Sequence, residues 1–278
     1  DFGSAFVDEN KVTEEIEKIF RRGLINYSEN EALRIILNCI DLTTLEGNDT
    51  NEKVVALCKK GMSFSMYGNN IPNVAAICVY PPFAKIVSEN LKNTGIKTAC
   101  VAGAFPSGQS PLFVKLIEVK YAVDEGAEEI DMVISRGKFL EKEYNVVYDE
   151  IKSIKEFCGN AHLKVILETG ELQNLTQVKI ASDIAIEAGG DFIKTSTGKI
   201  QPAATYEAVY VMLNSIKEYY QKTGKMIGIK PAGGISEPIQ ALQYFMLVET
   251  VLGEKWLNNK YFRIGASRLA DKIIDKLK

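Results

Sequence analysis

The sequence predicts an α/β fold, a (β/α)8 TIM barrel that forms a single domain with an N-terminal helical extension. Short runs rich in Ile and Val alternate with longer segments whose apolar residues recur at helical spacing. Eight such runs are present, and the 278 residues are close to the about 250 that one barrel domain needs. An open doubly wound sheet is the alternative, but no G-x-G-x-x-G follows the first run.

The expected strands are too short for helices and apolar throughout, as in a parallel sheet covered on both faces. They span residues 35–40, 74–79, 97–102, 129–134, 164–168, 191–195, 226–230 and 262–265. The helices expected between them span residues 51–60, 82–93, 112–125, 141–157, 174–188, 203–220 and 238–252. Residues 1–33 are expected to form a helical extension that caps the bottom of the barrel, and residues 34–278 form the barrel itself.

Composition excludes several classes of function. The net charge of −3 argues against a nucleic-acid surface, and the single histidine, His162, leaves no basis for a His-rich metal site or a Ser-His-Asp triad. No apolar stretch approaches the roughly 20 residues of a membrane span. The five cysteines form no C-x-x-C pair and no secretory signal is visible, so we expect reduced thiols and a cytoplasmic location.

Charged residues recur where the apolar runs end, which is the end of the barrel that carries active sites. These positions are Asp41, Cys78, Asp131, Glu168, Lys194, Lys230 and the turn from Gly265 to Arg268. Two lysines at the mouth of one barrel are expected to lower each other's pKa, because each disfavours a second positive charge. A neutral lysine attacks carbonyls and forms Schiff bases. We therefore expect Lys194 to be the nucleophile and Lys230 its partner in proton transfer.

Three of these strand-end residues each have two interpretations. Asp131 orients a water or accepts a proton from the carbinolamine, or it forms a salt bridge to one of the lysines. Asp41 binds a substrate hydroxyl, or it caps and fixes the first loop. Cys78 is expected to be a small residue lining the barrel top, with a thiol that is trapped by aldehyde products as the alternative.

Glycine turns follow the last two strands and predict a phosphate site. Backbone N–H groups freed by such turns point at an anion, and the loops after strands seven and eight are the usual phosphate cradle of this fold. The candidate groups are Gly198, Lys199, Gly233, Gly234, Gly265 and Ser267. The implied substrate is a small phosphorylated carbonyl compound.

The motifs around these residues resemble those of the class I, Schiff-base 2-deoxyribose-5-phosphate aldolases. The shared segments are residues 41–45, 73–81, 129–131, 164–172, 191–199, 228–235 and 263–267, in the same order along the chain. Residues 1–30 have no comparable match. The resemblance implies a TIM barrel that reversibly cleaves 2-deoxy-D-ribose 5-phosphate to D-glyceraldehyde 3-phosphate and acetaldehyde.

The resemblance also implies roles for individual residues. Lys194 forms the Schiff base, and Lys230 and Asp131 support proton transfer. The phosphate is held by Thr197, Gly198, Lys199, Gly233, Gly234, Gly265 and Ser267. No metal or organic cofactor is implied, and the expected partner is the phosphorylated sugar rather than nucleic acid or membrane. A homodimer is a further expectation, based on Tyr219 and Tyr220 as exposed aromatics.

The chain departs from the family pattern at several places. Ser236 stands where relatives often carry a basic residue, and Arg268 stands where they carry a second Ser. We hypothesise that Arg268 restores the missing charge from the other phosphate loop. Ala104 and Pro82 replace residues that are often Asn and Arg. The chain ends at Lys278 without the Tyr of some relatives, so proton transfer at the acetaldehyde carbon is expected to be slow or to use another route.

Two rival functions remain open from the sequence. One is a different sugar-phosphate lyase on the same barrel, which the aldehyde pair that exchanges would distinguish. The other is a binding or scaffold protein with little activity, because fold alone does not determine function.

Overall fold

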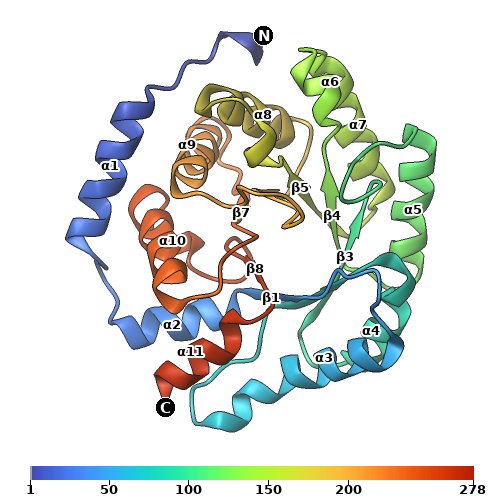
Figure 1. The fold of residues 1–278 in the computed structure, drawn as a ribbon, viewed down its shortest axis with the longest axis vertical. Coiled ribbons are helices and arrows are strands. Elements are labelled where there is room, and N and C mark those ends of the chain that lie inside the picture. Colours follow the sequence, from blue (N-terminus) through green and yellow to red (C-terminus); the bar gives the residue numbers. More distant parts are fainter. Residues whose placement is uncertain (1) are drawn as a thin grey trace.

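The computed structural model describes residues 2–278, and residue 1, where the expected extension starts, lies outside the described residues. Within this range eight parallel strands form one sheet in the order β7-β6-β5-β4-β3-β2-β1-β8. Two bridges, Ile229 to Phe262 and Ala232 to Gly265, join β7 to the β8 side, so the sheet closes into a barrel. The helices surround the strands in an outer ring (Figure 1), which confirms the predicted TIM barrel.

The strands are β1 (Ile40–Thr43), β2 (Ala76–Val79), β3 (Lys97–Ala102), β4 (Glu129–Val133), β5 (His162–Ile166), β6 (Phe192–Lys194), β7 (Gly228–Lys230) and β8 (Ile264–Ala266). The α-helices are α1 (Glu9–Arg22), α2 (Glu29–Asn38), α3 (Asn51–Ser63), α4 (Ala84–Asn90), α5 (Leu112–Asp124), α6 (Arg136–Leu140), α7 (Tyr144–Phe157), α8 (Leu175–Glu187), α9 (Tyr206–Thr223), α10 (Pro238–Val251) and α11 (Leu269–Leu277). Short 3-10 turns occupy Phe2–Ser4, Phe64–Tyr67, Pro81–Phe83, Thr169–Glu171 and Glu254–Trp256. None of the helices between residues 2 and 278 is long and apolar enough to cross a bilayer.

The first predicted strand is wrong. Most of residues 35–40 lie in α2, and β1 begins only at Ile40. The helix is fixed by a capping box, in which the Ser28 hydroxyl accepts from the Glu31 N–H and the Glu31 carboxylate accepts from the Ser28 N–H. The division expected at residue 33 therefore falls inside α2. The sequence also did not predict α6 or α11 as separate helices.

Helix α1 lies on the flank of the barrel rather than across its bottom (Figure 1). Its buried face of Val12, Ile16 and Ile19 belongs to the main hydrophobic core, and the helix contacts α9 and α10. Because this apolar stripe runs along one side of the helix, it is buried best against the outer surfaces of two neighbouring helices. The position differs from the cap that the sequence suggested.

The bottom of the barrel is filled by an aromatic ring. Phe192 is buried, and a Cβ added to Gly228 on the neighbouring strand would lie 2.4 Å from the Phe192 ring. The ring lies 6.0 Å from the Lys164 ammonium and 5.8 Å from the Arg263 guanidinium, measured to its centroid. Phe192 therefore forms a floor beneath the charged groups of the interior.

We predict that Gly228→Ala lowers the free energy of unfolding by about 1–3 kcal/mol, because the new methyl group overpacks the floor. Gly47→Ala is the matched control, since a Cβ there meets nothing within 4 Å. Urea unfolding measures both. A Gly228→Ala midpoint equal to that of Gly47→Ala would contradict the packing account, and adding Phe192→Leu should restore part of the loss.

Candidate active site

Lys194 and Lys230 are the last residues of β6 and β7 and are direct neighbours in the sheet register. Both are buried, and both Nζ atoms bond the same oxygen, Oδ2 of Asp131 in β4, at 2.8 Å and 2.7 Å. The structure therefore brings together the three residues that the sequence proposed for catalysis. The salt-bridge reading of Asp131 is confirmed by this geometry.

A wider ionic network lies around this trio. Lys230 Nζ also bonds Asp41 Oδ2 at 2.6 Å, and Lys164 Nζ bonds the same oxygen at 2.8 Å. Strands β1 and β5, which carry Asp41 and Lys164, do not pair with each other, so this bond crosses the barrel interior. Arg263 donates from NH1 to Asp41 Oδ1 and from both terminal nitrogens to Glu129, each at 2.8 Å.

Lys164, Glu129 and Arg263 were missed by the sequence analysis, which searched strand ends. The signal that could have found Glu129 is the period of two along a strand: it precedes Asp131 by two residues and therefore faces the same side. Lys164 is the register partner of Asp131 in β5, with Nζ 3.2 Å from Asp131 Oδ1.

Lys194 and Lys230 differ in their electrostatics. Burial lowers the pKa of Lys194 below the ordinary value of a lysine, and the charge of Lys230 lowers it further against the opposing effect of Asp131. For Lys230, burial also disfavours the charge, but Asp131 and Asp41 outweigh it and raise its pKa. The pKa of Lys230 is therefore raised rather than lowered as the sequence suggested, and Lys194 is the lysine of the pair whose pKa is lowered.

The charge balance of the buried network also favours loss of a proton from Lys194. Within the described chain this network joins three carboxylates to four basic side chains: Asp41, Glu129 and Asp131 to Lys164, Lys194, Lys230 and Arg263. Burying an uncompensated charge costs several kcal/mol or more. Burial raises the pKa of Asp131, but Lys164, Lys194 and Lys230 outweigh it and hold that pKa below its usual range. With the carboxylates ionised, loss of one proton from Lys194 brings the network to zero net charge.

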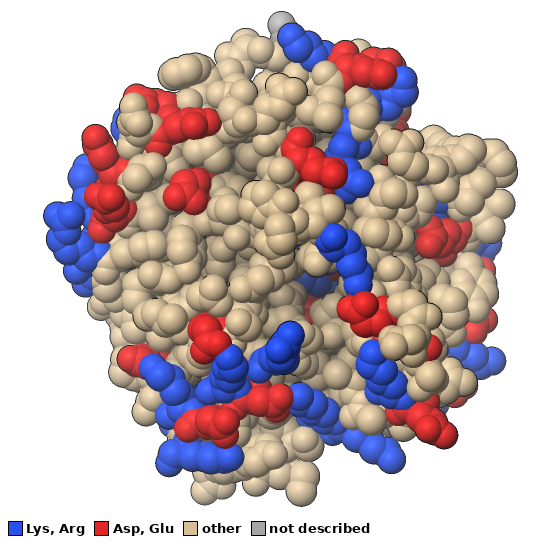
Figure 2. Space-filling model, viewed as in Figure 1, with Lys and Arg blue, Asp and Glu red and all other residues tan. Residues whose placement is uncertain are grey.

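A cleft of about 890 Å³ opens above Lys194. The predicted residues that line it are Thr197, Gly198, Lys199, Gly233, Gly234, Gly265, Ser267 and Arg268. Three further basic residues, Lys53, Lys60 and Lys272, line the same cleft and were not predicted. Figure 2 shows basic side chains, mixed with acidic ones, gathered over the region where Figure 1 places α3 and α11. The cleft thus combines a buried amine at its floor with basic groups around its wall.

The walls of the cleft depend on glycines. Gly198, Gly233 and Gly234 all have left-handed φ angles, of 79°, 86° and 74°. A Cβ at Gly233 would lie 2.6 Å from Ala203 Cβ and 3.2 Å from Gly198 Cα, so the loops after β6 and β7 touch through their backbones. Lys199 reaches across the cleft to Glu46 at 3.1 Å. Arg268 and Ser267 are exposed just before the first residue of α11.

Asp41 and Cys78 lie below the cleft rather than in its wall. Asp41 is fully buried, and its two oxygens accept from Lys164, Lys230 and Arg263, so neither is directed at a substrate hydroxyl. Cys78 is fully buried within β2, and burial raises the pKa of its thiol. This environment favours the packing interpretation of Cys78 over a reactive thiolate.

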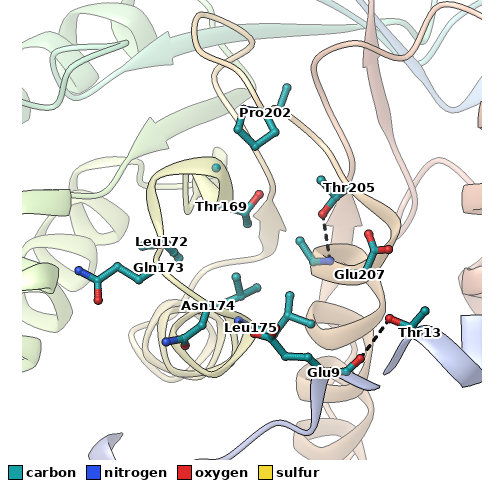
Figure 3. A pocket seen from close by; sticks show the side chains of 14 residues that line it. Glu9, Thr13, Thr169, Leu172, Gln173, Asn174, Leu175, Pro202, Thr205 and Glu207 are labelled. Carbon is teal, nitrogen blue, oxygen red and sulfur yellow. Dashed lines mark hydrogen bonds between the residues drawn. The ribbon is translucent and has the colours of Figure 1, made fainter. Parts of the chain in front are cut away.

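A separate pocket of about 340 Å³ lies near the starts of α1, α8 and α9 (Figure 3). Thr169 and Pro202 line it, and Glu9 and Glu207 are the two carboxylates among its described lining residues. None of the sequence-predicted site residues is among the described residues that line it. The chemistry of the predicted site therefore belongs to the larger cleft.

Comparisons with known proteins agree with this picture. The family model for the DeoC/LacD family aldolases matches residues 35–244. The chain is 45% identical over 245 residues to the deoxyribose-phosphate aldolase of Homo sapiens, covering 84% of this chain and 77% of that protein. It is 44% identical to the enzyme of the same description from Mus musculus, with the same coverage. A solved structure, described as a unique tetrameric structure of deoxyribose phosphate aldolase from Aeropyrum pernix, aligns with a TM-score of 0.71 at 25% identity, over 95% of this chain and 97% of that one.

A (β/α)8 barrel with a buried lysine pair under a basic cleft defines a carbon–carbon lyase of the aldolase class. Within that class, the chain belongs to the DeoC/LacD aldolase family, because the family model covers most of the barrel.

Proposed function

We propose that the protein reversibly cleaves 2-deoxy-D-ribose 5-phosphate to D-glyceraldehyde 3-phosphate and acetaldehyde through a Schiff base on Lys194. The observation that carries the proposal is the buried Lys194 amine, whose pKa is lowered while that of its neighbour Lys230 is raised. Relatives that are 44–45% identical to this chain over 245 aligned residues are described as deoxyribose-phosphate aldolases.

The reaction starts at the neutral amine. Lys194 Nζ attacks the C1 aldehyde of the open-chain sugar, and the carbinolamine loses water to give a protonated imine. The C3 hydroxyl gives up its proton, the C2–C3 bond breaks, and its electron pair moves into the imine, which becomes an enamine. D-glyceraldehyde 3-phosphate leaves. The enamine takes a proton at C2, and water hydrolyses the resulting imine to acetaldehyde and free Lys194.

The residues around Lys194 support these proton movements. The Lys230 Nζ, which lies 2.7 Å from Asp131 Oδ2, is the local acid, and Asp131 is the acceptor that both lysines share. Asp41 acts as an anchor, since it holds Lys230 at 2.6 Å. The ammonium of Lys230 and the other buried cations stabilise the negative charge that develops during the reaction.

The phosphate occupies the upper part of the cleft. The groups that bind it are Thr197, Gly198, Lys199, Gly233, Gly234, Gly265, Ser267 and Arg268, all of which line the cleft with Lys194. Backbone N–H groups of the left-handed glycines and the start of α11 supply donors, and Lys199 and Arg268 supply positive charge.

We also propose self-association and a cytoplasmic location. The aromatics on which a homodimer was predicted are half-buried, and Tyr220 packs edge-on against the buried Trp256 at 5.0 Å. The outer face of α5 is a better surface, because Phe113 and Ile117 are 66% and 64% exposed one helical turn apart. Sedimentation velocity of the wild-type chain tests the association.

The cysteines support the proposed cytoplasmic location. All five cysteines are buried and free, as expected of a reducing compartment.

We predict that reduction with borohydride in the presence of 2-deoxyribose 5-phosphate traps a stable adduct on Lys194. Peptide mass spectrometry locates the modified lysine. Lys194→Met should abolish the adduct, and Lys222→Met is the matched control, since Lys222 is exposed and distant from the cleft. A folded wild-type protein without an adduct on Lys194 would contradict the proposal and favour a phosphate-binding scaffold.

We predict that Arg268→Ala raises KM for 2-deoxyribose 5-phosphate by about tenfold or more, because a charge-assisted hydrogen bond is worth roughly 1.5–3 kcal/mol. The measurement compares KM for this substrate with KM for unphosphorylated 2-deoxyribose, which should not change. Lys278→Ala serves as a basic-residue control away from the cleft. An unchanged KM for the phosphorylated sugar would show that Arg268 does not replace the charge absent at Ser236.

A further inference from the structure

Arg136, the first residue of α6, joins two loops of the catalytic face without lining the cleft itself. Its guanidinium donates to the carbonyl oxygens of Pro106 and Ser107 in the loop after β3, at 3.1 Å and 2.7 Å. The same group reaches Glu168 at 3.1 Å and Glu171 at 2.7 Å in the loop after β5. These contacts use the planar array of five N–H donors that only arginine offers.

Glu168 carries the connection into a third loop. Its buried carboxylate accepts from the Thr197 hydroxyl at 2.6 Å and from the Thr197 N–H at 3.1 Å. Its backbone has a left-handed φ of 54°, a strained conformation for a residue other than glycine that persists only where the surroundings enforce it. Thr197 is followed by Gly198 and Lys199, which line the cleft. Glu168 therefore fixes the start of the loop that carries the phosphate groups.

The backbone next to Arg136 is held in place by contacts with two helices of the outer ring. The preceding residue, Ser135, donates to the Glu150 carboxylate of α7 at 2.9 Å and accepts from Lys115 Nζ of α5 at 2.9 Å. Lys115 and Glu150 are themselves paired at 2.9 Å, and both are buried. The backbone from which the Arg136 side chain extends is thus held by a buried ion pair.

We propose that Arg136 is a positioning residue that determines specificity for the phosphorylated sugar. It neutralises the buried Glu168 carboxylate and aims it at Thr197, which holds the loop of residues 197–199 in the shape that binds phosphate. Without the guanidinium, the Glu168 carboxylate is left buried with no basic partner and turns toward water, releasing Thr197. The reacting lysines belong to a different set of contacts and keep their geometry. The inference rests on the proposed function, since it assigns the phosphate end of that substrate.

The first test compares two substrates in Arg136→Met. We expect KM for 2-deoxyribose 5-phosphate to rise about tenfold, which corresponds to about 1.4 kcal/mol, with kcat nearly unchanged. Cleavage of unphosphorylated 2-deoxyribose should stay at the wild-type level. Lys138→Met is the matched control, because Lys138 lies in the same helix but its ion pairs, among residues 2–278, are those with Glu141 and Glu143 at the surface. Arg136→Lys keeps the charge and loses the planar fork, and should fall between wild type and Arg136→Met.

A merely structural role gives a different pattern. If Arg136→Met lowers kcat/KM equally for both sugars, or leaves KM for the phosphorylated sugar unchanged, the inference is overturned. A double-mutant cycle with Thr197→Val checks the route: the two effects should be non-additive, because the arginine acts through Glu168 on Thr197. Additive effects contradict the route.

Calorimetric binding of inorganic phosphate separates this inference from the proposed function. Wild-type protein should bind phosphate, and Arg136→Met should bind it about tenfold more weakly, whether or not the wild type cleaves deoxyribose 5-phosphate. If the wild-type protein does not cleave deoxyribose 5-phosphate but still binds phosphate more tightly than Arg136→Met does, only the proposed reaction is overturned. Equal phosphate affinity in the two proteins, or no binding by the wild type, overturns the role of Arg136.

Discussion

The lowered pKa of Lys194 depends on its burial and on the charges of the network beneath it. Three carboxylates and four basic groups share the inside of the barrel in the described chain, and Lys194 is the group nearest the cleft. Desolvation makes any net charge there expensive, and the lysine with a single carboxylate partner releases its proton most easily. Lys230 and Lys164 each bond more than one carboxylate and stay charged. The fold thus leaves one amine less well paired than its neighbours, as the proposed nucleophile requires.

The closed parallel barrel is what allows this arrangement. Its strands bring Asp41, Asp131 and Lys164 within hydrogen-bonding distance of side chains from several other strands, although they are far apart in the chain. The same closure directs the loops after β6, β7 and β8 to one opening above Lys194. The separation into a floor that carries the amine and a rim that carries the residues proposed to bind phosphate follows directly, since loops extend beyond the strand ends.

The sequence predicted the repeating pattern well because buried parallel strands are compact apolar runs. It failed where local pattern and tertiary position differ. Most of the apolar run at residues 35–40 lies in helix α2 and contributes to its buried face. Because the first strand was predicted over this run, several residues too early in the sequence, the prediction placed Asp41 just after the end of a strand. Asp41 is in fact the second residue of β1, which places it below the cleft, and Cys78 is likewise inside β2. Glu129 and Lys164 were overlooked because the prediction rested on the ends of the strands, whereas these charges lie within strands and face the barrel interior.

The phosphate site shows the same limit. Glycine turns after strands seven and eight were visible as sequence motifs, but the basic residues Lys53, Lys60 and Lys272 reach the cleft from helices α3 and α11. The pairing of Thr197 with Glu168, and of Glu168 with Arg136, was equally hidden, since the three residues come from different parts of the chain. Such contacts depend on the packing of loops, which no local periodicity encodes.

The most direct test is an NMR titration that follows the side-chain Nζ resonances of Lys194 and Lys230 in the folded protein, assigned with Lys194→Met and Lys230→Met. The account predicts that Lys194 titrates below the ordinary lysine value of about 10.4, while Lys230 remains charged above it. If Lys194 stays protonated as firmly as Lys230, the buried network does not generate a neutral amine, and the central claim is wrong.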